Sequence, residues 1–74
     1  MRYAVHLLND DTDERVEFIA TLSRDESKSV SSLKRRDPKQ ANLIGQCFAL
    51  KQAYSKYSAR SWCHVEPPET IGIN

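Results

Sequence analysis

The side chains best suited to binding chemistry in this sequence are cations between residues 34 and 60. Guanidinium groups bind phosphate through two parallel hydrogen bonds, and several cation–phosphate contacts provide most of a protein's affinity for nucleic acid. The predicted phosphate contacts are Lys34, Arg35, Arg36, Lys39, Lys51, Lys56 and Arg60. Tyr54 and Tyr57 lie among them and could stack on bases. The simpler alternative is a solvated helix face with both tyrosines in the core.

The charges are separated along the chain, although the net charge of all 74 residues is only +1. Residues 1–27 carry a net charge of −4, residues 28–60 carry +7 and residues 61–74 carry −2. Such a separation indicates an acidic partner for the basic segment 28–60. Nucleic acid, or a nucleoprotein complex that handles it, is the expected partner.

A cluster of carboxylates precedes the basic segment. Its members are Asp10, Asp11, Asp13 and Glu14. A calcium-binding loop would also require a glycine at its sixth position and a glutamate at its twelfth, and this sequence has neither. The cluster is therefore expected to be a solvated turn. The next alternative is an acidic surface that docks on a basic groove of another protein.

The cysteines and histidines do not form a recognisable metal or catalytic motif. Cys47, Cys63, His6 and His64 lack the short spacings of structural zinc sites. A Cys–His nucleophilic pair would need a third group to orient it, and none can be identified. Glycine-rich phosphate loops and common hydrolase motifs are absent from the sequence. The sequence therefore predicts a non-catalytic protein without a metal or cofactor.

One long amphipathic helix, over residues 37–60, is expected to organise these groups. Asp37 is a suitable N-cap, and Pro38 suits the first helical position. The predicted core-facing stripe consists of Leu43, Cys47, Leu50, Tyr54 and Tyr57, widened by Ile44 and Phe48. Gly45 interrupts the helix at a cost of about 1 kcal/mol relative to alanine, which predicts a close approach of the helix to a sheet.

The remaining segments alternate between apolar and polar residues, as strands do. Residues 2–8 and 15–22 are predicted to form a β-hairpin around the polar turn, and residues 61–66 a third strand. Ser23 and Glu26 form a capping-box pattern at the start of the segment 24–36. This segment is predicted to form a short, loosely packed helix rather than a mobile basic loop. Residues 69–74 are expected to be a tail, unless Ile71 and Ile73 extend the sheet edge.

These elements predict an α+β fold, a small two-layer sandwich with the long helix across one face of the sheet. Residues 1–68 would form a single domain, followed by the tail 69–74. The expected core is Val5, Leu7, Val16, Phe18, Leu43, Ile44, Cys47, Phe48 and either Trp62 or Val65.

This order of elements is similar to that of some small bacteriophage proteins that inhibit host RNA polymerase or CRISPR complexes. The resemblance covers topology only. It implies an alternative function, a compact inhibitor that docks on a protein through the acidic hairpin, a sheet edge or the helix face. No apolar run approaches the length of a membrane span and no signal peptide is recognisable, so a cytoplasmic location without a membrane partner is expected. The short chain leaves a homodimer open.

Overall fold

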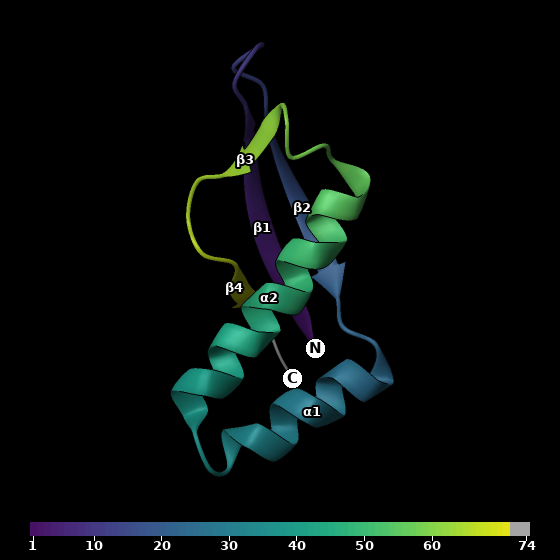
Figure 1. Cartoon of the computed structure of the whole chain (residues 1–74), viewed down its shortest axis with the longest axis vertical. Coiled ribbons are helices and arrows are strands. Elements are labelled where there is room, and N and C mark those ends of the chain that lie inside the picture. Colours follow the sequence, from purple (N-terminus) through teal and green to yellow (C-terminus); the bar gives the residue numbers. More distant parts are fainter. Residues whose placement is uncertain (72–74) are drawn as a thin grey trace.

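The computed structural model describes residues 1–71 as a four-stranded antiparallel sheet with two helices (Figure 1). In chain order the elements are β1 (Arg2–Asn9), β2 (Arg15–Thr21), α1 (Arg24–Lys34), α2 (Pro38–Lys56), β3 (Trp62–His64) and β4 (Glu69–Ile71). The prediction of a small α+β sandwich is confirmed. The molecule is elongated, measuring 42 × 19 × 19 Å, and α2 runs diagonally across one face of the sheet.

Strand β1 is the centre of the sheet. It pairs with β2 along one edge and with both β3 and β4 along the other. Tyr3, Val5 and Leu7 alternate toward the helix side and are buried, as the sequence pattern predicts. Residues 69–71 pair with β1 as β4, so they add to the sheet and are not a loose tail. Ile73 lies outside the described residues.

The turn between β1 and β2 is built by the side chain of Asn9. Its Oδ1 accepts hydrogen bonds from the main-chain N–H groups of Asp11 (2.8 Å) and Thr12 (3.2 Å). Asp13 adopts a φ of 60°, a left-handed conformation that aspartate tolerates better than most residues. This conformation closes the hairpin and leaves the carboxylates of the turn exposed.

The outer edge of β2 has no strand beside it within residues 1–71. Near its end, Gln52 of α2 takes the place of a neighbouring strand. The Gln52 Oε1 accepts a hydrogen bond from the Thr21 N–H (3.2 Å), and the Gln52 Nε2 donates to the Thr21 carbonyl. One side chain thus satisfies both main-chain groups of an edge residue.

Helix α2 begins where the sequence predicts but ends earlier. The Asp37 carboxylate caps it by accepting a hydrogen bond from the Gln40 N–H (3.2 Å), and Pro38 occupies the first turn. The expected end at residue 60 is wrong, because the helix stops at Lys56 and Tyr57 adopts an extended conformation. From there the Tyr57 ring packs edge-on against Phe18 and Trp62.

The face that α2 turns toward the sheet differs from the prediction. The buried residues are small and spaced four apart, namely Ala41, Gly45, Ala49 and Ala53. Leu43, with 53% of its surface exposed, and Cys47, also exposed, were expected in the core and lie outside it. Small side chains allow the helix axis to come close to the sheet, where the Tyr3 ring needs the space. The larger residues are therefore displaced to the flanks.

The rest of the predicted core is in place. Val16, Phe18, Ile44 and Phe48 pack against the buried cluster. Of the two candidates from the third strand, Trp62 packs on the core and Val65 is 46% exposed. Further buried side chains, outside the expected core set, are Ala20, Leu22 and Val30.

Candidate nucleic-acid interface

Helix α1 is ordered by its N-terminal cap and by one buried anchor. The Ser23 hydroxyl accepts from the Glu26 N–H (3.2 Å), and the Glu26 carboxylate accepts from the Ser23 N–H (2.9 Å). Val30 is 3% exposed and Leu33 is half-buried against α2. The predicted short helix is confirmed over Arg24–Lys34, and its remaining faces are free to meet a ligand.

The turn from α1 to α2 is tight and hydrogen-bonded. The Leu33 carbonyl accepts from the N–H groups of both Arg36 (3.0 Å) and Asp37 (2.8 Å). The cations around this turn are Lys34, Arg35, Arg36 and Lys39, all of them exposed. We call these four residues the basic end. The fold thus holds this part of the predicted site together on an ordered backbone.

The cations of the basic end have no carboxylate partner among the described residues. Asp37 is the nearest acid in sequence, and its carboxylate caps α2. Within residues 1–71, the one contact at salt-bridge distance is that between His6 Nε2 and the Glu17 carboxylate (3.6 Å) on the sheet. Unpaired guanidinium and ammonium groups keep their donors available for phosphate oxygens.

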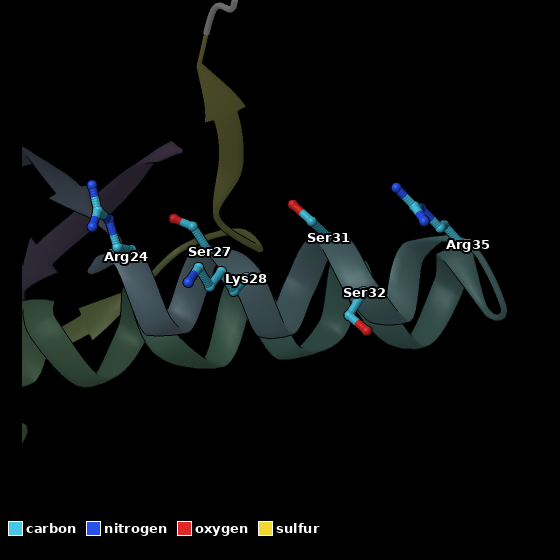
Figure 2. A pocket seen from close by; sticks show the side chains of 6 residues that line it. All are labelled: Arg24, Ser27, Lys28, Ser31, Ser32 and Arg35. Atoms are coloured by element: carbon cyan, nitrogen blue, oxygen red, sulfur yellow. The ribbon is translucent and has the colours of Figure 1, made fainter.

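A second basic surface adjoins the basic end, and the sequence reasoning missed it. We call it the outer face of α1; it consists of Arg24, Ser27, Lys28, Ser31, Ser32 and Arg35. These side chains line an open hollow of about 650 Å³ (Figure 2). Their spacing of three and four residues was the available signal. It was missed because Arg24 belongs to the acidic third of the sequence.

The remaining predicted cations do not gather with the basic end. Lys51 is exposed further along α2, and Lys56 is in its last turn, about 26 Å from Lys39 by helical rise. The Lys56 ammonium lies 5.9 Å from the Phe18 ring centroid and 5.7 Å from that of Tyr57, in cation–π contact. Arg60 lies near the acidic turn and away from the basic end, because the carbonyl of the next residue, Ser61, accepts a hydrogen bond from the Asp10 N–H (2.9 Å).

Tyr54 and Tyr57 are engaged within the domain. The Tyr54 hydroxyl accepts from the His64 N–H (2.8 Å) and shares a hydrogen bond with His64 Nδ1 (3.0 Å). The Tyr57 ring lies with its centroid 5.1 Å from that of Trp62 and 6.2 Å from that of Phe18. Both rings are half-buried, which agrees with the core alternative for these tyrosines and not with a platform for bases.

The predicted acidic surface lies at the other end of the molecule. Asp10, Asp11, Asp13 and Glu14 form the tip of the β1–β2 hairpin, opposite the α1–α2 turn (Figure 1). All four are exposed. The molecule is therefore acidic at one end of its long axis and basic at the other.

Cys47 lies on α2, whereas His6, Cys63 and His64 lie on the sheet. Within residues 1–71, no three His, Cys, Asp or Glu side chains come together as a metal site would require. Partial desolvation raises the pKa of the Cys63 thiol, and the charge of Asp10 and the hydrogen bond it accepts from Sγ (3.7 Å) raise it further. A raised pKa lowers the thiolate fraction, so Cys63 is a poor nucleophile at neutral pH.

No known protein family, curated protein or solved structure matches this chain. In the described part of the chain, no helix has the length and apolar character needed to cross a membrane. The exposed side chains are therefore the basis on which a function can be inferred.

Proposed function

We propose that this protein binds nucleic acid, alone or within a nucleic-acid-handling complex, through phosphate contacts made by its basic end. The supporting observation is the clustering of Lys34, Arg35, Arg36 and Lys39 on an ordered turn, without carboxylate partners among the described residues. Each cation that neutralises a phosphate releases a condensed counterion, which makes the affinity fall steeply with salt. The protein needs no catalytic group for this function.

Fluorescence anisotropy with labelled duplex DNA and single-stranded RNA tests the proposal. The parent is compared with Lys34→Ala/Arg35→Ala/Arg36→Ala at low and near-physiological salt. The slope of log K against log salt should become shallower by about 2–3 when three phosphate contacts are lost. The matched control, Lys51→Ala/Lys56→Ala/Arg60→Ala, removes the same charge from the other half of the molecule. It should retain most of the affinity.

Two results would overturn the proposal. One is the absence of binding by the parent even at low salt. The other is an equal loss of affinity in both triple variants, because binding would then depend on net charge and not on the basic end. Circular dichroism of each variant separates loss of contacts from loss of fold.

A second candidate function is a compact inhibitor that docks on another protein. It is favoured by the exposed acidic hairpin tip, by the exposed Leu43 on α2 and by the open edge of β2. A free sheet edge can accept a strand from a partner. Such an inhibitor should not bind free nucleic acid, so the anisotropy measurement separates the two functions. Affinity capture with a Leu43→Asp variant as control would then identify the target.

A further inference from the structure

The outer face of α1 has the dimensions of a helix that crosses a nucleic-acid groove. Arg24 and Arg35 are eleven residues apart, which places them about 16 Å apart along the helix axis and within about 20° of the same side. Both are exposed, and Figure 2 shows them pointing to the same side of α1 with Ser27 and Ser31 between them. The two guanidinium groups thus bound a face of short side chains.

The residues between the two arginines suit close contact with base edges. Ser27 and Ser31 extend only two heavy atoms beyond the backbone, which leaves the open hollow along the helix, whereas Ser32 points away from the two arginines in Figure 2. A serine hydroxyl can donate or accept a hydrogen bond, so it can meet any base. Lys28 lies on the adjoining flank and adds a donor for guanine or for phosphate.

The major groove of B-form DNA, about 12 Å wide, admits one α-helix. A helix that crosses it would carry Arg24 to the phosphates of one strand and Arg35 to those of the other, because their separation exceeds the groove width. Arg35 also belongs to the basic end. Lys34, Arg36 and Lys39 would therefore continue along the second strand.

Other nucleic acids fit this face less well. Proteins that bind single strands use exposed aromatic rings as stacking platforms. Tyr54, Tyr57 and Trp62 are all packed against other side chains of the domain. The major groove of double-stranded RNA is too deep and narrow for side chains to read.

We infer that the ligand of this surface is double-stranded DNA, with α1 lying across the major groove between Arg24 and Arg35. This inference rests on the proposed function, because it presupposes that the basic end contacts phosphate. It goes further by assigning the form of nucleic acid and the element that enters it.

A competition experiment tests the inference. Labelled duplex DNA is displaced by unlabelled duplex DNA, duplex RNA and single-stranded DNA of equal length at one salt concentration. Duplex DNA should compete best. In the same assay, Ser31→Leu places a bulky side chain on the outer face without changing charge, and it should weaken duplex DNA binding by about tenfold, the scale of one lost base contact. Ser29→Leu makes the same change at an exposed position of α1 that lies off this face.

The possible failures are distinguishable. If single strands or duplex RNA compete as well as duplex DNA, the inference is overturned while the proposed function stands. Equal affinity of the two leucine variants would show that the outer face of α1 does not enter the groove. It would leave the proposed phosphate contacts of the basic end unaffected. If the parent binds no nucleic acid at low salt, both proposals fail. Either leucine raises helix propensity relative to serine, so loss of α1 is not expected.

Discussion

The Tyr3 side chain occupies the space that a Cβ atom on residue 45 would need. A Cβ built on Gly45 would overlap the Tyr3 hydroxyl and lie 2.7 Å from the Tyr3 Cζ atom. Tyr3 is 1% exposed at the centre of the sheet, so its ring has little room to move aside. The missing side chain of one residue thus sets how closely α2 approaches β1.

Gly45→Ala should destabilise the protein despite the higher helix propensity of alanine. Overpacking of a buried site costs about 1–3 kcal/mol. The gain in propensity is at most about 1 kcal/mol. Urea denaturation should therefore give a lower midpoint for the variant with an unchanged slope. In a Tyr3→Phe background the closest overlapping atom is absent, so the same substitution should cost less. Equal costs in the two backgrounds would show that the overlap is relieved elsewhere.

Substitution of Ala49 should destabilise the protein more than substitution of Leu43, although leucine is the larger residue. Leu43→Ala should change the free energy of unfolding by less than about 0.5 kcal/mol, because about half of the Leu43 surface is already exposed to water. Ala49→Leu should cost about 1–3 kcal/mol, because Ala49 is fully buried against the sheet. Thermal and urea unfolding of both variants measure the difference. A larger effect at Leu43 would restore the helix face predicted from the sequence.

The fold could be predicted because its signals are local. Alternation over β1 and β2, the Ser23 and Asp37 caps and Pro38 each act within a few residues, and each is found in the structure. The face of α2 could not be predicted. Leu43 and Cys47 have the right spacing for a core stripe. The helix turns its small residues toward the sheet instead, because the Tyr3 ring, from a distant segment of the chain, occupies the space beside Gly45. Only the glycine at position 45 indicated that approach.

The candidate site was predictable only in part, for a similar reason. Lys34, Arg35, Arg36 and Lys39 are close in sequence and remain together in space. The length of α2 separates Lys56 and Arg60 from them, and a count of charges along the chain does not show this. The outer face of α1 combines Arg24 with residues of the basic segment 28–60. A division of the sequence by net charge places Arg24 in the acidic segment 1–27 and therefore separates it from the rest of this face.

Removal of the Gln52 side chain should loosen the edge of β2. Gln52→Ala leaves the Thr21 N–H and carbonyl to water, at a cost of about 1 kcal/mol. Hydrogen exchange should report it directly, as faster exchange of the Thr21 amide with little change at Val5 in the central strand. Gln52→Glu keeps an acceptor for the Thr21 N–H but loses the donor, so its effect should be intermediate. Unchanged exchange in the alanine variant would mean that the bond is absent in solution.

The two cysteines should differ in their reactivity toward an alkylating reagent. Cys47 is exposed, whereas the pKa of Cys63 is raised above its ordinary value by desolvation and by Asp10. Below pH 9 the thiolate fraction of Cys63 is therefore depressed, and Cys47 should be modified first in a mass-spectrometric time course. Asp10→Asn removes the negative charge, lowers the pKa of Cys63 and should accelerate its modification. No acceleration would indicate that Asp10 does not influence the thiol.

The placement of charge at the two ends of the molecule has a consequence for how it meets a charged partner. The acidic hairpin tip and the basic end are held apart along a body 42 Å long, which makes the protein a permanent electric dipole. The field of any polyanion exerts a torque on such a dipole and turns its positive pole forward. The torque acts within about a Debye length, roughly 8 Å at physiological salt, so the molecule is oriented just before its side chains touch. The acidic tip thereby helps decide which surface of the molecule faces a polyanion.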